Sequence, residues 1–161
     1  MSAPQSRDED AARRFADQFG NILAESGVPR MPARVFAALI ASKDGRLTAA
    51  ELSKQLQASP AAISGAVRYL LQLHLASRER DPGSRRDVYA VQDDVWLESI
   101  LQQDKVLVRW QDILQQGVAA TGDGTAASHR IGTTLAFTRF LQDEHADLIE
   151  RWRKHKAELD L

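Results

Sequence analysis

The chain has 161 residues, a formal net charge of −1 and no cysteine, which excludes disulfides, thiolate catalysis and cysteine-based zinc sites. It is 43% hydrophobic and 27% charged, as is usual for a globular protein. No apolar run approaches the ~18 residues of a membrane span, and the polar start lacks the apolar core of a signal peptide. We therefore expect a cytoplasmic protein with no membrane partner.

The charge is unevenly distributed along the chain. Residues 28–91 carry 10 basic and 5 acidic side chains, a net charge of +5. The flanks are acidic: residues 1–27 carry 3 basic and 5 acidic side chains, and residues 92–161 carry 8 basic and 12 acidic side chains. A basic middle indicates an anionic partner there, although chance clustering on a solvated surface explains the same counts.

The first elements in chain order are two amphipathic helices. Apolar residues at three- and four-residue spacing predict a helix over 8–26, and Gly27 is placed to end it. Pro32 suits the first turn of a second helix, which we expect to run to about Ser42. The sequence KDGR then predicts a turn.

Two capped helices follow at close spacing. Thr48 and Glu51 form the pattern of a capping box, which predicts a short helix over 49–56. After a three-residue turn, Ser59 is placed to cap a helix that begins at Pro60 and runs to about Leu73. A short helix, a tight turn and a second capped helix are typical of a helix-turn-helix, in which the second helix enters the DNA major groove.

The second of these helices has an unusually bare exposed face, made of Ala61, Ala62, Ser64 and Gly65. Small residues let a helix lie close to base edges, alanine methyls contact thymine methyls, and Arg68 one turn on reaches a phosphate or a guanine. The alternative is that the small residues pack against another helix, within the subunit or across an interface. The helix alone does not decide between these interpretations.

A basic hairpin follows and favours DNA. Two short strands, 78–80 and 87–91, on either side of a DPGS turn predict a hairpin within 77–91, with Val88, Tyr89 and Val91 as strand formers. Arg85 and Arg86 lie just past its tip. Residues 46–48 are expected to supply a third short strand. Paired arginines at such a tip suit phosphate contact or insertion into a narrow minor groove, unless they pair with Asp81 and Asp87. The combination is that of a winged helix.

Residues 27–91 resemble the MarR family of transcriptional regulators. The similar run is RVFAALIASKDGRLTAAELSKQLQASPAAISGAVRYLLQLHLASRERDPGSRRDVYAV, and the GVPR that precedes it and the SPAAIS that opens the second helix look closest to a GbsR-like branch. The resemblance implies a homodimeric winged-helix regulator on an imperfect palindrome. The contact positions carried over are Ser59, Ala61, Ala62, Ser64, Gly65, Arg68, Arg85 and Arg86. Thr48 and Pro60, at the two helix starts, complete the predicted DNA-binding set.

Two features depart from the family pattern. His74 stands where the family usually has a glycine, at the point where the chain turns back after the recognition helix. Histidine tolerates a left-handed backbone better than most residues. The start of the recognition helix also lacks the Arg, Gln or Thr often found there, which leaves more of the recognition to DNA shape.

The C-terminal part is predicted to be helical. We expect one helix from about 93 to Gln116, a loop over 117–125, and a last helix from Ala126 to Glu158. The last helix has a near-heptad seam that favours dimerisation, although a helical domain packed within one chain is the alternative. Its members are Ile131, Leu135, Thr138, Leu141, His145, Leu148, Trp152, His155 and Leu159.

No metal, cofactor or catalytic site is predicted. His145 and His155 lie ten residues apart, which is not a metal-ligand spacing, and we expect them in the seam, where protonation would loosen the dimer. No serine lies in a nucleophile-elbow context and no glycine-rich phosphate loop is present, so the chain is not expected to be an enzyme.

The predicted fold is mostly α with a small β-wing: a winged helix-turn-helix plus a helical dimerisation module. The predicted divisions are an N-terminal dimerisation helix at 1–27, a DNA-binding domain at 28–92 and a dimerisation region at 93–161.

The predicted function is a DNA-binding regulator, acting as a repressor on a palindromic operator. A small-molecule effector would bind near Phe15, Phe19, Trp96 and Trp110, unless these belong to the core. The alternatives are a winged-helix protein-interaction module and a nucleoid-type protein that reads DNA shape.

Overall fold

A computed structural model of the chain describes residues 4–80 and 86–159, with side chains from Asp10 onward. The chain divides into two compact units, Met1–Trp96 and Leu97–Leu161. Within the described residues, no helix combines the length and apolar character needed to cross a membrane.

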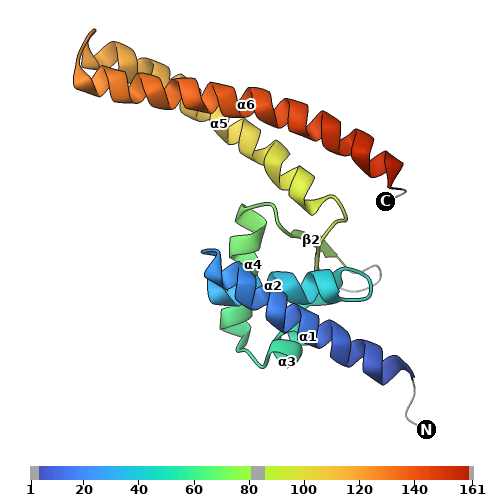
Figure 1. Ribbon diagram of the computed structural model, residues 1–161. Coiled ribbons are helices and arrows are strands. Elements are labelled where there is room, and N and C mark those ends of the chain that lie inside the picture. Colours follow the sequence, from blue (N-terminus) through green and yellow to red (C-terminus); the bar gives the residue numbers. More distant parts are fainter. Residues whose placement is uncertain (1–3, 81–85, 160–161) are drawn as a thin grey trace. The chain divides into compact units, whose positions relative to one another are not determined.

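The first unit is a winged helix (Figure 1). Its three strands form one antiparallel sheet in the order β1-β3-β2, with Leu47 and Arg78 both opposite Tyr89. The fold is therefore mostly helical with a small sheet, as the sequence predicts. Its elements in chain order are α1 (Pro4–Glu25), α2 (Arg30–Ala41), β1 (Arg46–Thr48), α3 (Ala49–Leu56), α4 (Pro60–Gln72), β2 (Ser77–Arg80) and β3 (Asp87–Ala90).

The core of this unit lies where α2, α3 and α4 meet. Large apolar side chains from all three helices are fully buried there, and Tyr89 and Val95 join the same cluster. The members that fill most of its volume are Val35, Phe36, Leu39, Leu52, Ile63, Val67 and Leu70. Because Ile63, Val67 and Leu70 anchor α4 in this core, the opposite face of α4 is left outward.

The N-terminal helix α1 packs against α2 within the first unit. Ala16 is buried, and a Cβ added to Gly20 would lie 3.3 Å from the Cα of Arg34, so the two helices approach closely at this glycine. The rings of Phe15 and Phe19 stack with centroids 5.6 Å apart. The boundary between the units falls after Trp96, and α1 belongs to the winged-helix unit.

Gly45 fixes how the turn after α2 meets the sheet. The backbone N–H of Val91 donates to the carbonyl of Gly45 at 2.8 Å. The φ of Gly45 is +64°, and an added Cβ would lie 2.9 Å from the carbonyl oxygen of Val91. This turn therefore requires glycine both for its backbone conformation and for the close approach.

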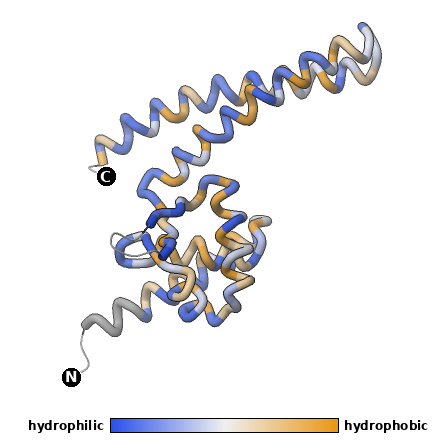
Figure 2. Tube along the Cα trace, turned by 180° about the vertical axis from the view of Figure 1, so that it is seen from behind, coloured by the Kyte–Doolittle hydropathy of each residue, from blue (hydrophilic) through white to orange (hydrophobic). Residues whose placement is uncertain are grey.

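The second unit is a helical hairpin of α5 (Val95–Thr121) and α6 (Ala126–Glu158), whose helices run alongside each other in Figures 1 and 2. The expected end of the first helix at Gln116 is wrong, because α5 continues to Thr121 and the connection shortens to residues 122–125. Gly117 lies inside the helix, where an added Cβ would lie 3.4 Å from Ile131. Gly122 and Gly124 have positive φ and make the turn.

Polar pairs join the two helices of the hairpin. The side chain of Gln111 donates to that of Gln142 at 3.0 Å, and that of Arg139 donates to Gln115 at 3.0 Å. Leu135, Thr138 and Ile149 are buried. The first part of the heptad spacing of α6, up to His145, thus describes its pairing with α5 inside one chain, whereas the later seam residues from Leu148 on are exposed.

Candidate nucleic-acid interface

The start of α3 is a complete capping box. The Thr48 hydroxyl accepts from the backbone N–H of Glu51 at 3.2 Å, and the Glu51 carboxylate accepts from the Thr48 backbone N–H and hydroxyl, each at 2.7 Å. The backbone donor first, and then the hydroxyl, lower the pKa of Glu51 below its ordinary value. The Thr48 hydroxyl is therefore committed to holding α3 in place.

Loss of this cap has a pH-dependent cost. Replacing Thr48 with alanine is expected to lower the free energy of unfolding by about 1 kcal/mol at pH 7. Because the folded pKa of Glu51 is lowered, its contribution is present above the ordinary pKa of glutamate and is lost as pH falls through the lowered value. Urea unfolding at pH 7 and pH 3 measures the difference, which should shrink at pH 3. Glu51→Gln is the control, since it keeps an acceptor but removes the titration.

The turn between α3 and α4 is closed by hydrogen bonds. Gln57 adopts a left-handed conformation with φ of +50°, and the Ser53 hydroxyl donates to the carbonyl of Ala58 at 2.6 Å. Arg34 donates from α2 to the carbonyl of Leu56 at 3.1 Å, which satisfies the end of α3. Sequence reasoning did not identify this role of Arg34, because nothing local marks it.

The recognition helix α4 begins as predicted. The Ser59 hydroxyl accepts from the backbone N–H of Ala62 at 3.2 Å, and Pro60 occupies the first helical position. Both residues are exposed, but the Ser59 hydroxyl already serves the cap. Among the predicted contact residues, Ser59 and Thr48 therefore also carry the local structure of the two helices.

The outward face of α4 is open. Ala61, Ser64, Gly65 and Arg68 are exposed, and a Cβ added to Gly65 would have no atom within 4 Å. Ala62 is half-buried at the edge of this face. Within the described part of the first unit, the small residues are therefore not packed against another helix. This excludes packing inside that unit, and packing across an interface between copies stays the alternative to DNA binding.

Helical spacing orders these side chains along α4. At 3.6 residues per turn, Ala61, Gly65, Arg68 and Gln72 fall on one line opposite the buried face, with Ser64 beside it. Arg68 has no hydrogen bond or ion pair with the residues that the structure describes. Gln72 is exposed at the end of the line. It was not among the predicted contact residues, because those were chosen only from the first turns of the helix.

The described part of the wing carries two ion pairs and further exposed cations. Arg78 pairs with Asp87 at 3.7 Å and lies over the ring of Tyr89, and Arg46 pairs with Glu79 at 2.9 Å. Asp87 thus pairs with Arg78. Arg80 at the end of β2 is exposed and is a further cation that sequence reasoning did not single out.

Of the two predicted wing arginines, the structure describes only Arg86. Arg86 is exposed directly before β3, and Arg85 lies outside the described residues, as does Asp81. At the other end of the wing, His74 has φ of +56° and accepts the left-handed conformation for which the family uses glycine. The departure at position 74 thus leaves the turn intact.

Comparison with known proteins identifies this arrangement. A model of the MarR family matches residues 26–87, and a model of MmpR5-like MarR family transcriptional regulators matches residues 94–155. The chain belongs to the MarR family. It is therefore a DNA-binding transcriptional regulator rather than an enzyme.

Two relatives extend the similarity to nearly the whole length. The HTH-type transcriptional regulator MmpR5 of Mycobacterium tuberculosis is 22% identical over 147 residues, which cover 91% of this chain and 89% of the relative. The crystal structure of a transcriptional regulator superposes with a TM-score of 0.78 at 21% identity, over 89% of this chain and 99% of the other. This likeness supports the winged helix and helical hairpin of the MarR fold.

The aromatic residues predicted to bind an effector are spread along this MarR chain. Trp96 is half-exposed, packs edge-on against Phe36, and lines a cavity of about 560 Å³ in the first unit. Lys43, Asp44 and Asp93 also line this cavity. Phe15 lies exposed on α1 beside Phe19, and Trp110 is exposed on α5.

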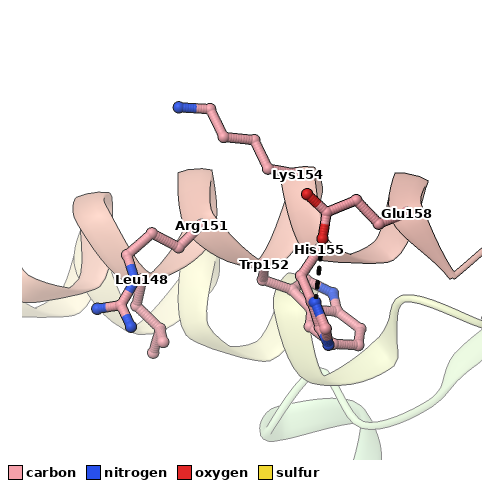
Figure 3. Close-up of a pocket in the computed structure, with 6 residues that line it drawn as sticks. All are labelled: Leu148, Arg151, Trp152, Lys154, His155 and Glu158. Atoms are coloured by element: carbon pink, nitrogen blue, oxygen red, sulfur yellow. Dashed lines mark ion pairs between the residues drawn. The ribbon is translucent and has the colours of Figure 1, made fainter.

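The two histidines of the predicted seam have different surroundings. His145 is largely buried and its Nδ1 lies 2.7 Å from the Asp104 carboxylate, which joins α6 to α5. His155 is 60% exposed beside Trp152, 3.6 Å from Glu158, on an open groove along α6 (Figure 3). Within this MarR chain His145 therefore contacts α5, whereas burial of His155 in a dimer seam stays a prediction.

Proposed function

We propose that the chain is a homodimeric MarR repressor that binds a palindromic operator, with α4 in the major groove and the wing on the backbone or minor groove. The observation that carries this proposal is the outward face of α4. Among the described residues of the first unit, nothing packs on this face, and it presents Ser64 and Arg68 beside small residues. A helix of this kind fits between the walls of a major groove.

The proposed wing contacts are tested by salt dependence. Replacing both Arg85 and Arg86 with alanine should weaken binding to operator and unrelated DNA alike, because phosphate contacts carry no sequence information. The slope of log K against log salt should fall by roughly 0.9 for each lost phosphate contact. Fluorescence anisotropy from low to physiological salt measures it. Arg151→Ala, on α6, is the control, and an unchanged slope in the wing variant would show that Arg85 and Arg86 make no phosphate contact.

We assign dimerisation to the apolar face of the hairpin. Val106, Trp110 and Ile113 are exposed on α5, where helical spacing aligns them to one side of the residues that face α6. Phe137, Leu148 and Trp152 are exposed on the corresponding side of α6. We define these six residues as the apolar face. A surface of this kind marks an interaction site, and a second copy of the chain is the partner that the family leads us to expect.

The other finer assignments stay predictions. The division into a dimerisation helix at 1–27, a DNA-binding domain at 28–92 and a dimerisation region at 93–161 belongs to this proposal, as does control by a small-molecule effector. Some MarR regulators bind effectors: for BpsR of Bordetella bronchiseptica, 6-hydroxynicotinic acid regulates DNA binding. The cavity beside Trp96 has the size of a small-molecule site.

The GbsR-like branch also stays a prediction, since the matching models describe the MarR family and its MmpR5-like group.

Selection of genomic DNA fragments by the purified full chain tests the proposal. A recovered palindrome, bound at physiological salt in the presence of excess unrelated DNA, is the expected result. Retention of all fragments alike would identify a nucleoid-type protein instead. Retention of none would leave the winged helix as a protein-interaction module.

A further inference from the structure

The recognition helix offers bases an unusual set of groups. In the first turns of α4 the outward side chains are methyl groups, one hydroxyl and one guanidinium, from Ala61, Ala62, Ser64 and Arg68. No side-chain amide or carboxylate lies between Pro60 and Arg68. The groups that read adenine and cytosine most directly, Asn or Gln and Asp or Glu, are therefore missing from this part of the helix.

The neighbouring hydroxyls do not fill this gap. Ser59 accepts from the Ala62 backbone N–H, and Thr48 is held in the capping box by Glu51. The Thr48 hydroxyl both donates and accepts within the capping box, so contacting a base would break the cap. The Ser59 hydroxyl only accepts in its cap and keeps one O–H donor, which suits an acceptor such as a phosphate or a base oxygen. On the first turn of α4 itself, after the cap, base contacts are therefore left to the methyl groups of the two alanines.

A methyl group has one good partner in the major groove, the C5-methyl of thymine. Cytosine at the same place presents an N4 amino donor, which loses its water against an alanine and gains no acceptor. Gly65 lets the helix approach these methyls closely, since nothing lies within 4 Å of the place of its missing Cβ. Arg68, one turn further, has donors that match the O6 and N7 of guanine.

We propose that α4 recognises its half-site through thymine methyl groups opposite Ala61 and Ala62, followed by a guanine opposite Arg68. This inference rests on the proposed function and names the class of DNA sequence that the helix selects. The contribution of the methyls is apolar and local, whereas that of the guanine is a directed hydrogen bond. The two parts of the half-site are therefore separable by experiment.

The test replaces thymine with uracil at single positions of the operator that fragment selection recovers. Uracil keeps every hydrogen-bonding group and lacks only the methyl. Each substitution at a contacted position should raise the Kd of the unaltered full chain by about fourfold, the effect of one buried methyl group. Uracil at positions outside the half-sites should have no effect.

Two variants assign the contacts. Ala61→Gly should bind the thymine operator about as weakly as the unaltered chain binds the uracil operator, and uracil opposite position 61 should cost it nothing further. Arg68→Ala is the matched control: it should keep the uracil penalty and lose its preference for guanine. Circular dichroism confirms that both variants are folded.

The outcomes separate this inference from the proposed function. Equal Kd values for thymine and uracil operators, with operator still preferred over unrelated DNA, would overturn the inference and leave the regulator in place. A chain that prefers no fragment would overturn the proposed function. Because the uracil comparison uses the unaltered chain, it does not depend on the stability of any variant.

Discussion

A phenylalanine in place of Ser64 should abolish operator binding while the fold remains intact. Ser64 is exposed beside the line of Ala61, Gly65 and Arg68, and it is not part of the Ile63, Val67 and Leu70 face that anchors α4 in the core. A large ring at this place keeps the helix backbone away from the floor of the major groove. The contacts of every outward residue are then lost together, so the expected loss is the whole difference between specific and unrelated binding, about 4–10 kcal/mol.

Anisotropy with operator and unrelated duplexes measures this effect. Ala119→Phe makes the same increase in size at an exposed position of α5 and should leave the Kd unchanged. Thermal unfolding should show similar stability for both variants, since neither residue is buried. If Ser64→Phe binds operator as tightly as the unaltered chain, α4 is not the recognition helix.

The helix starts were predictable because their causes are local. Thr48 with Glu51, and Ser59 with Pro60, form caps whose partners lie within three residues in the sequence, and α3 and α4 begin at the predicted residues. The positive φ of His74 agrees with the glycine that the family pattern has at this position. Such features depend on hydrogen bonds that a short segment makes with itself.

Features that depend on distant residues were not predictable in the same way. Gly117 looked like part of a loop, but it lies inside α5, where it faces Ile131 of α6. Arg34 reaches the end of α3 from α2, 22 residues away. The heptad spacing of α6 was visible, yet spacing alone does not say whether the partner helix belongs to the same chain.

Whether the small face of α4 is exposed or packed was likewise not predictable from the sequence. The sequence showed that Gly65 and its neighbours are small, and left packing and DNA as equal explanations. The open space around Gly65 excludes packing of this face against the described residues of the first unit. The match to the MarR family indicates that the chain binds DNA. The wing contacts of Arg85 and Arg86 stay predictions, because neither composition nor the described residues assign them a partner on DNA.

A charged residue on the apolar face of the hairpin should abolish the dimer. Ile113 is 67% exposed, so a charged residue there should cost the single chain little stability. At the centre of a dimer interface, however, the same charge is desolvated without a partner, which costs several kcal/mol. Ile113→Glu should therefore convert the dimer into a monomer of about the 17.9 kDa chain mass, as light scattering measures it.

The loss of the dimer should also weaken operator binding far more than any single DNA contact. Two linked winged helices bind the second half-site at a high effective concentration, and separation of the copies removes this gain, a factor of about 10²–10⁴. Ala119→Glu introduces the same charge on the opposite side of α5 and should stay dimeric with an unchanged Kd. A dimeric Ile113→Glu variant would place the interface elsewhere on the chain, with exposed Phe15 and Ile22 on α1 as the next surface to test. A monomeric variant that still binds the full palindrome as tightly as the unaltered chain would instead show that the two half-sites are bound independently.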